Sequence, residues 1–316
     1  MTSAQSHAHL PLGTGAEFDA IRAMLGVWGA QASGIGDDAA LLSVPEGEVL
    51  VASTDASFEH VHFRREWLTP REIGARAAAA ALSDLAAMAA RPIGLLFALV
   101  LPEAWRDDAS AIASGVGKAA RTAGCRIIGG NVSSGESLSI TTTVLGTSAK
   151  PLTRSGAKPG DSVFVTGNLG GAAAAVAAWE SGHPPEAKCR ERFVQPSARI
   201  EEAIWLAAHG ASSAIDLSDG LSTDAGHVAL ASGVSMVIDV ERVPLATGAT
   251  LNDALSGGED YELLVTAADL DGGEFQRIFG TPLTRIGAVE AGAGAVFTKA
   301  GKPFTPRTGF DHLSVK

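Results

Sequence analysis

The chain has 316 residues, of which 46% are hydrophobic and 19% charged, and its formal net charge is −11. This composition is typical of a folded globular protein long enough for two domains, and it excludes a disordered chain. The negative charge argues against a protein that binds nucleic acid or an anionic membrane surface. An acidic protein that handles an anionic substrate needs a positive group between the two, and a divalent metal ion is the obvious candidate.

Cysteine use and the N-terminal residues bear on the compartment. The two cysteines, Cys125 and Cys189, lie outside any metal-binding or redox spacing. We therefore expect reduced structural thiols rather than a disulfide or a zinc site. The first twelve residues lack a basic region followed by an apolar one, and no segment is apolar for long enough to span a membrane. These features predict a cytoplasmic protein.

The first half of the chain alternates predicted helices and strands. After a loose tail at 1–15, apolar residues at helical spacing predict a helix over 17–29. A capping box with proline at the first helical position begins a second helix at Thr69, which runs to about residue 90. The other elements expected here are strands at 39–44 and 48–53, a strand at 93–101, a helix at 103–123, and strands at 126–128 and 137–146.

A glycine- and proline-rich connection at 154–161 leads into a second unit of similar design. Both halves therefore read as α/β units in a loosely duplicated plan. The segment 182–196 is expected to be irregular. The elements expected around it are a strand at 162–166, helices ending near 181, 209 and 232, and strands at 214–216, 234–240, 261–266, 285–289 and 295–298.

Acidic residues recur at the ends of apolar runs, beside glycine or hydroxyl residues. The first case is the stretch 33–42, where two glycines precede the adjacent carboxylates of Asp37 and Asp38. The other acids in this setting are Asp55, Asp84, Asp216, Asp219, Glu259 and Asp260. Magnesium prefers oxygen ligands of this kind, whereas a soft-metal site needs cysteine or histidine clusters that are absent. Each corner alone also fits a structural role as a hairpin turn or a helix cap.

Among these acids, the position of Asp84 most strongly indicates a functional role rather than a purely structural one. It shares a helix face with Ala77 and Ala81, in a run of five alanines that lets a neighbouring element approach closely. A carboxylate buried there without a partner would be costly. The chain lacks GxxxxGK[ST], a complete GxGxxG, GxSxG and HExxH. ATP, if bound, would therefore be held through metal ions and acids rather than a lysine-bearing loop.

Taken together, these corners resemble the thiamine-monophosphate kinases, a family of the aminoimidazole-ribonucleotide-synthetase-like superfamily. The matching segments are GIGDDAALL (34–42), STD with a following His-Phe (53–63), ALSDLAAMAARP (81–92), LTRSGAKPGD (152–161), AIDLSDGL (214–221), SGGEDYEL (256–263) and a closing GFDHL (309–313). The resemblance covers nearly the whole chain in order. This combination is far more specific than any single segment.

The resemblance implies an activity and a fold. The activity is transfer of the γ-phosphoryl group of ATP to thiamine monophosphate, with Mg2+, giving thiamine diphosphate and ADP. The fold is a two-domain α/β (α+β) structure similar to aminoimidazole ribonucleotide synthetase. An N-terminal domain, 1–148, would bind ATP and Mg2+ and form a homodimer through its sheet, and a C-terminal domain, 149–316, would complete the site. The acceptor is an ionised phosphate, so positioning and charge neutralisation suffice without a general base.

The matched motifs carry the family's functional residues onto this chain. The implied Mg2+ ligands are Asp37, Ser53, Thr54, Asp55, Asp84, Asn131, Asp216 and Asp219. Four of them carry the catalytic assignment: Asp37, Asp55, Asp84 and Asp219. The implied ATP contacts are Gly130, Asn131, Arg154 and Ser218, and the implied thiamine monophosphate contacts are His62, Glu259 and Phe310. A carboxylate and an aromatic face suit the cationic thiazolium ring, and an arginine suits a phosphate.

Two positions depart from the family pattern. Asn131 stands where the family usually has the aspartate of GGD, which keeps a carbonyl oxygen but removes one negative charge. Phe310 stands where a tyrosine or tryptophan is expected, so a hydroxyl contact is missing there.

Two kinds of alternative remain. One is another enzyme of the superfamily: the synthetase itself, which the SGGEDYEL segment does not support, a selenophosphate synthetase, or a hydrogenase-maturation factor. Selenophosphate synthetases carry an N-terminal cysteine or selenocysteine region, and the maturation factors end in cysteine. This chain has neither feature and ends in Lys316. The other kind is a non-catalytic regulator that binds nucleotide or thiamine phosphate, which Asn131 makes conceivable. The remaining acids argue against it, because they would repel one another without a metal.

Overall fold

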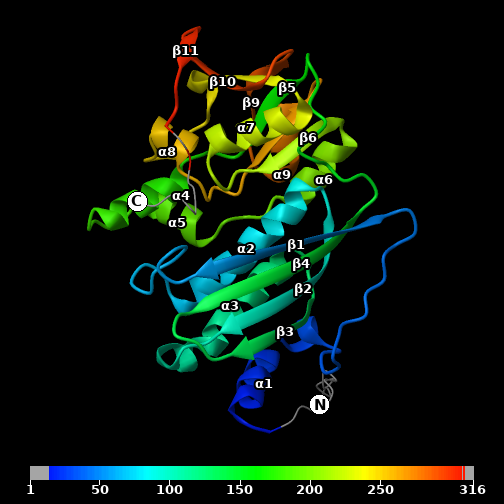
Figure 1. Cartoon of the computed structure of the whole chain (residues 1–316), viewed down its shortest axis with the longest axis vertical. Helices are drawn as coiled ribbons and strands as arrows, with labels where there is room; N and C mark the ends of the chain where they lie inside the picture. Colours follow the sequence, from blue (N-terminus) through cyan, green and yellow to red (C-terminus); the bar gives the residue numbers. More distant parts are fainter. Residues whose placement is uncertain (1–13, 308, 310–316) are drawn as a thin grey trace. The chain divides into compact units, whose positions relative to one another are not determined.

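The structure, a computed structural model, describes residues 14–307 and 309 (Figure 1). The chain divides into two compact units, Met1–Leu85 with Arg91–Ala149, and Ala86–Ala90 with Lys150–Lys316. Each unit has its own sheet and its own helices, which confirms the predicted mixed α/β class. Among the described residues, no helix combines the length and apolar character needed to cross a membrane.

The first unit is built on a four-stranded sheet with the strand order β1-β4-β2-β3. Strands β2 and β3 are parallel, and the other two pairs are antiparallel. The elements are helix α1 (Ala16–Trp28), 3-10 helix η1 (Gly29–Ala32), strand β1 (Val49–Phe58), helix α2 (Pro70–Ala87), strand β2 (Arg91–Val100), 3-10 helix η2 (Glu103–Asp108), helix α3 (Ala109–Thr122), strand β3 (Ile127–Ser133) and strand β4 (Ser139–Ser148).

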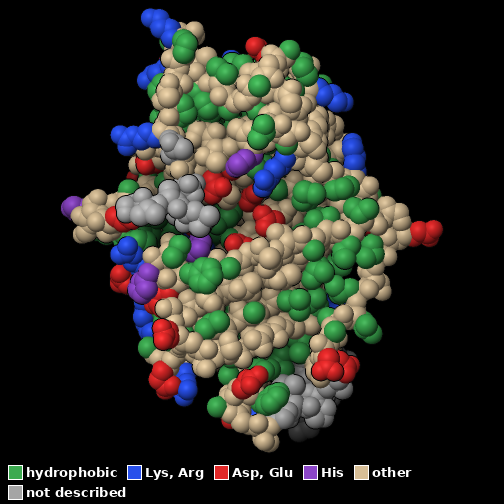
Figure 2. Space-filling model, viewed as in Figure 1, with side chains coloured by type: hydrophobic (Ala, Val, Ile, Leu, Met, Phe, Trp, Pro, Cys, Tyr) green, Lys and Arg blue, Asp and Glu red, His purple; other side chains and the backbone are tan. Residues whose placement is uncertain are grey.

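The two faces of this sheet differ in burial. On one face, Leu95, Phe97 and Leu99 of β2 are buried, and the ring of Trp28 in α1 meets Phe97 edge-on with centroids 5.9 Å apart. Successive strand residues point to opposite faces. Leu50 and the other even-numbered residues of β1 therefore lie on the opposite face, along which no helix of the described part of this unit packs (Figure 1). Figure 2 shows hydrophobic and uncharged polar atoms over this face, with few charges.

Helix α2 begins as the sequence predicts. The Thr69 N–H donates to Glu72 Oε2 at 2.9 Å, and the Glu72 N–H donates to Thr69 Oγ1 at 3.3 Å, which is a capping box. The helix packs tightly on α3, because a Cβ at Gly74 would overlap the carbonyl oxygen of Ile112. Small residues on α2 thus let the two helices approach one another closely.

The second unit is built on a seven-stranded sheet with the order β11-β10-β7-β9-β5-β8-β6. Helix α7 contributes Leu221, Ala225 and Val228 to a buried core with residues of β5 to β10. The elements are β5 (Ser162–Thr166), α4 (Gly171–Glu180), α5 (Ala187–Val194), α6 (Ile200–Ala208), β6 (Ala211–Asp216), α7 (Leu221–Ser232), β7 (Ser235–Asp239), η3 (Val240–Arg242), α8 (Leu251–Ser256), β8 (Leu263–Ala267), α9 (Gly272–Phe279), β9 (Leu283–Glu290), β10 (Gly294–Lys299) and β11 (Lys302–Phe304).

Two of the predicted elements are wrong. The segment 39–44 forms no strand: Leu41 is fully exposed, and β1 pairs with β4 alone among the described strands. An apolar run becomes a strand only when a partner satisfies its backbone groups. The segment 182–196, expected to be irregular, contains α5, whose apolar Cys189 and Phe193 share one buried face. Helix α8 and strand β11 were not anticipated.

Candidate active site

One group of predicted site residues lies on β1 and α2 of the first unit. Ser53 Oγ donates a hydrogen bond of 2.5 Å to Oδ2 of Asp84. Asp55 lies two residues beyond Ser53 on the same strand and therefore on the same face. All three side chains are partly buried. The structure thus brings a hydroxyl and two carboxylates to the helix-covered face of the sheet.

A row of paired residues extends from Asp55 across this sheet. Asp55 pairs with Thr142 of β4, Thr142 with Phe97 of β2, and Phe97 with Gly130 of β3. A Cβ at Gly130 would overlap the carbonyl oxygen of Phe97, so a residue without a side chain is required there. The predicted ATP contact Gly130 therefore lies in the same row as Asp55.

Three other predicted residues of this unit are placed differently. Thr54 lies on the face opposite Asp55, with its Oγ1 2.9 Å from that of Thr143. Asn131 follows Gly130 on β3, so its side chain also lies on that opposite face, where it is exposed. Asp37 is exposed in the loop before β1. The roles of these three residues stay predictions.

His62 lies in the loop that follows β1. The Phe58 N–H donates to His62 Nδ1 at 3.0 Å, so in the neutral ring the proton is on Nε2. The loop is tied to the rest of the unit by Glu59, whose Oε2 accepts a hydrogen bond of 3.2 Å from Trp105 Nε1. The neutral His62 ring therefore offers Nε2–H as a donor.

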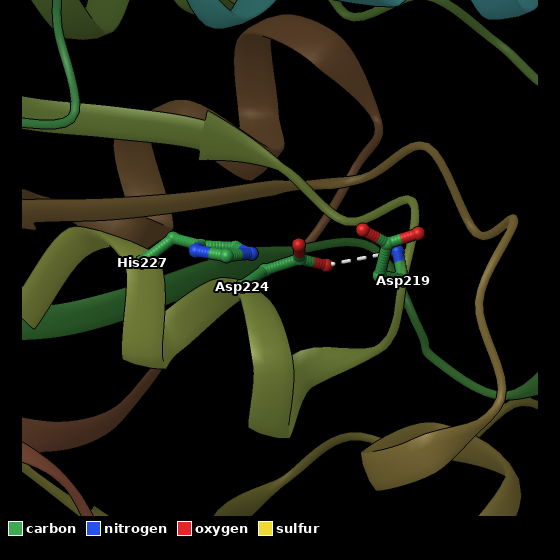
Figure 3. A group of neighbouring side chains, drawn as sticks. All are labelled: Asp219, Asp224 and His227. Carbon is green, nitrogen blue, oxygen red and sulfur yellow. Dashed lines mark hydrogen bonds between the residues drawn. The ribbon is translucent and has the colours of Figure 1, made fainter. Parts of the chain in front are cut away.

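A second group surrounds the junction between β6 and α7 in the second unit (Figure 3). Asp216 ends β6 and is buried, while Ser218 and Asp219 are partly buried in the turn that follows. Asp224, in α7, is 1% exposed, and its Oδ2 accepts a hydrogen bond of 3.1 Å from the Asp219 N–H. His227 lies one turn further along α7, and the ligand atoms of Asp219, Asp224 and His227 all lie within 4.8 Å of one another.

The electrostatics of this junction fit a divalent cation. Burial and the carboxylates of Asp219 and Asp216 raise the pKa of Asp224 to about 8, against the opposing hydrogen bond from Asp219 and the charge of Arg154. The exposed Arg154 thus lies near enough for its charge to act on this cluster. Clustered carboxylates beside a hydroxyl are the hard oxygen donors that Mg2+ requires, so the residues present fit this ion.

The turn that carries Glu259 packs directly on the Asp219 turn. The Glu259 N–H donates to the Ser218 carbonyl at 2.8 Å, and the Tyr261 N–H donates to the Leu217 carbonyl at 2.9 Å. A Cβ at Gly258 would overlap the Ser218 carbonyl. Glu259 and Tyr261 have φ of 65° and 52°, a left-handed conformation that is costly for residues other than glycine. The structure therefore brings Glu259 beside Ser218 and Asp219 at a cost in backbone strain.

Phe310 lies outside the described residues. Arg307, three residues before Phe310, contacts the end of α8 that precedes the Glu259 turn. Its carbonyl accepts a hydrogen bond of 2.8 Å from Ser256 Oγ. A Cβ at Gly309 would overlap the carbonyl oxygen of Asp219. Gly309 thus lies against the Asp219 turn.

Comparisons with known proteins agree with this arrangement. The chain matches the family described as AIR synthase related protein, N-terminal domain, over residues 36–148, and the corresponding C-terminal domain over residues 158–299. It is 37% identical over 302 residues to the thiamine-monophosphate kinase of Salmonella typhimurium, covering 89% of this chain and 92% of that protein. The chain belongs to the thiamine-monophosphate kinase family.

Solved structures extend this similarity to the fold. The crystal structure of a thiamine-monophosphate kinase from Stenotrophomonas maltophilia aligns with a TM-score of 0.80 at 34% identity, covering 94% of this chain and 100% of that chain. The structure described as AaThiL complexed with AMPPCP and TMP aligns with a TM-score of 0.76 at 31% identity, covering 96% and 99%. The resemblance to thiamine-monophosphate kinases and the fold that it implied are therefore confirmed.

Sequence reasoning missed two buried acids of this thiamine-monophosphate kinase family member. Asp224 lies outside every matched segment, although an acid one turn into the helix after AIDLSDGL was a usable signal. Glu262 is 1% exposed and pairs with both Arg192 and Arg199. No sequence spacing connects these two arginines with Glu262, so the sequence could not predict this ion-pair cluster.

Asp260 provides a pH-dependent prediction for this family member. Its Oδ2 accepts a hydrogen bond of 2.7 Å from the Gly170 N–H, next to the first residue of α4. Burial raises the pKa of Asp260 to about 7, against the opposing effects of that bond and of Arg192. A folded-state pKa above the unfolded value of about 3.9 makes the folded state bind more protons, so Asp260 lowers stability progressively as pH rises from about 4 to about 7.

The Asp260→Asn variant keeps an acceptor for Gly170 but cannot ionise. Its melting temperature relative to the wild type should therefore increase as the pH is raised from about 5 to about 8, where the wild type carries the buried charge. Thermal unfolding of the metal-free protein followed by circular dichroism measures this difference. The exposed Asp269→Asn variant is the control. A constant difference for Asp260→Asn across the range would show that the side chain does not titrate there.

Proposed function

We propose that this protein transfers the γ-phosphoryl group of ATP to thiamine monophosphate, forming thiamine diphosphate and ADP. The observation that carries the proposal is the packing of the Glu259 turn on the Asp219 turn, in a chain of the thiamine-monophosphate kinase family. The relative named AaThiL is described as complexed with AMPPCP and TMP, which supports a nucleotide and a phosphorylated acceptor as substrates. Membership of this family favours the kinase over the other enzymes of the superfamily.

Metal ligands in the proposal come from both units. Ser53, Asp55 and Asp84 would hold Mg2+ in the first unit, and Asp216 and Asp219 in the second. Asp37, Thr54 and Asn131 belong to the proposed set as well, with Thr54 and Asn131 on the face of the first sheet opposite Asp55. When bound, the ion neutralises part of the charge that keeps two phosphate groups apart.

The remaining residues bind and orient the two anions. Arg154, an always-charged planar fork, suits the ATP phosphates, and Gly130, Asn131 and Ser218 are the other proposed ATP contacts. His62 presents Nε2–H as a donor for the thiamine monophosphate phosphate. The Glu259 carboxylate suits the cationic thiazolium ring, as does the ring of Phe310. No side chain has to remove a proton, because the acceptor oxygen is already ionised.

Domain roles and assembly are also part of the proposal. Residues 1–148 would bind ATP and Mg2+ and form a homodimer, and residues 149–316 would form the C-terminal domain. Both cysteines are free and buried, which supports a cytoplasmic location. The face of the first sheet that carries Leu50 and Thr54 has few charges and exposes Leu50, which supports its use between two copies.

The dimer has a direct test. Leu50 is 51% exposed on that face, so Leu50→Glu should place a charge in the interface and convert a dimer to a monomer. Size-exclusion chromatography with light scattering measures the mass. Leu230→Glu, at an 80% exposed position of α7, is the matched control and should leave the mass unchanged. A wild-type protein with the mass of one chain would contradict the dimer.

Asn131 should weaken the binding of one Mg2+ without abolishing function. The Asn131→Asp variant restores a carboxylate, so its activity should reach half-maximum at a lower Mg2+ concentration than that of the wild type. Magnesium titrations of both proteins at saturating ATP measure the midpoints. Identical midpoints would contradict this prediction.

The activity itself is tested with purified protein, ATP, Mg2+ and thiamine monophosphate, following thiamine diphosphate by chromatography. Thiamine and aminoimidazole precursors are run in parallel. Formation of thiamine diphosphate from the monophosphate alone is the expected result. Binding of ATP without turnover at any Mg2+ concentration would favour the regulator instead.

A further inference from the structure

Asp224 is a buried acid directed at the Asp219 turn. Its side chain is on α7 yet 1% exposed, and the close-up view shows its carboxylate directed at the backbone nitrogen of Asp219 (Figure 3). The hydrogen bond from the Asp219 N–H to Asp224 Oδ2 is 3.1 Å long. Asp224 therefore contacts the backbone of a proposed metal ligand rather than offering itself to solvent.

Asp224 does not serve as the cap of its own helix. Helix α7 begins at Leu221 with Gly220 as its N-cap, and no side chain caps it there. The donor to Asp224 is the N–H of Asp219, which precedes the helix. The hydrogen bond that Asp224 accepts from the Asp219 N–H accounts for the position of its carboxylate.

The turn that carries Asp219 is held by several contacts. Gly220, the residue after Asp219, has φ of 100°, a conformation that favours glycine, and a Cβ there would lie 3.0 Å from the Leu255 carbonyl oxygen. The Glu259 N–H donates to the Ser218 carbonyl at 2.8 Å. Asp224 and Glu259 thus both form hydrogen bonds with the turn, and the bond of Asp224 is made to Asp219 itself.

We propose that Asp224 is a positioning residue that fixes the Asp219 backbone and so prepares the Asp219 carboxylate for its cation. The inference rests on the proposed function. Partners that orient metal ligands typically contribute 10–100-fold to metal affinity. Asp224 supplies a hydrogen-bond acceptor for the Asp219 N–H. The location of its oxygen therefore matters more for metal affinity than its charge does.

Two substitutions separate location from charge. Asp224→Asn keeps an oxygen at the same place and loses the charge, while Asp224→Glu keeps the charge and displaces the oxygen. Mn2+ binding to the full chain in the presence of AMPPCP is measured by electron paramagnetic resonance of free Mn2+. The Mn2+ sites that are lost in the Asp219→Ala variant are the ones that belong to the Asp219 turn. Asp224→Glu and Asp224→Ala should weaken those sites by about 10–100-fold, and Asp224→Asn by less than about threefold.

Two further readouts separate positioning from other roles. The exposed His227→Ala should bind Mn2+ like the wild type, although His227 belongs to the same group of neighbours. The KM for MgATP should rise in Asp224→Glu while that for thiamine monophosphate stays within about twofold, which a general loss of folding would not produce. If Asp224→Ala does not fold, the Asn and Glu pair decides the matter.

Several outcomes would overturn the proposal. Wild-type affinity in Asp224→Glu would show that the contact does not position Asp219. Equal losses in Asp224→Asn and Asp224→Glu, or a comparable loss in His227→Ala, would indicate a direct ligand instead. If wild type forms thiamine diphosphate and these variants bind Mn2+ normally, this inference alone fails. If wild type binds no Mn2+ with AMPPCP, the proposed metal centre fails with it.

Discussion

The Asp55→Asn variant should form thiamine diphosphate about 10²–10³-fold more slowly than the wild type at saturating substrates. Asp55 shares the helix-covered face of the first sheet with Ser53 and Asp84, and asparagine keeps its shape while removing one negative charge. Less charge on this face means weaker Mg2+ binding and weaker neutralisation of the two phosphates. Turnover at several Mg2+ concentrations, followed by chromatography, measures the loss.

The control for Asp55→Asn is Glu46→Gln, which makes the same change of charge at an exposed turn just before β1. That variant should turn over at the wild-type rate. The melting temperature of Asp55→Asn should equal or exceed that of the wild type, because a like charge near Asp84 has been removed. Retention of more than about a tenth of wild-type turnover in Asp55→Asn would exclude the assigned role.

The Glu262→Gln variant should have the largest effect on stability. Glu262 is 1% exposed, and its carboxylate accepts from Thr166 Oγ1 at 2.7 Å and from Arg199 Nε at 2.8 Å, in addition to its ion pair with Arg192. Removing one partner of a buried ion pair leaves the other charge uncompensated. We therefore expect the free energy of unfolding to fall by about 3–5 kcal/mol, measured by urea denaturation.

The pH dependence of this effect follows from the same contacts. Burial opposes ionisation, but the charges of Arg199 and Arg192, with the hydrogen bonds from Arg199 and Thr166, outweigh it and lower the pKa of Glu262. A depressed folded-state pKa stabilises above the unfolded value of about 4.3, and that stability is lost as the pH falls below it. The gap between wild type and Glu262→Gln should therefore shrink in acid.

Glu103→Gln is the matched control for Glu262→Gln. Glu103 pairs with Arg106 at 2.8 Å, but its side chain is 79% exposed. An exposed pair contributes less than about 1 kcal/mol, so this variant should unfold nearly as the wild type does. Equal effects of the two substitutions would show that the Glu262 cluster does not stabilise the second unit.

Local signals identified most elements and most candidate residues. The capping box at Thr69 and Glu72 formed as predicted, because its donors and acceptors lie within one turn of chain. The buried strand at 162–166 was predicted with its observed bounds. The predicted strand at 39–44 failed because a β ladder needs a partner that no local pattern specifies.

The faces on which Gly130 and Asn131 lie depend on a register shift in the first sheet. Between β2 and β3 the register shifts after Leu95, so Phe97 pairs with Gly130 and Ala98 with Asn131. In a regular ladder Asn131 would pair with Leu99 and share the face of Asp55. A shift of one residue exchanges the two faces of a strand. No local pattern in the sequence predicted the shift.

The sequence by itself determined the family, the two α/β units and most of the acids that could hold a cation, because these are carried by short motifs. Only the tertiary structure decided which acids share a face, that Asp224 reaches Asp219, and that Glu262 meets Arg192 and Arg199. The physical reason is that these contacts join residues through ladder register and helix packing. Those are set by the whole fold, and a motif records only its own few residues.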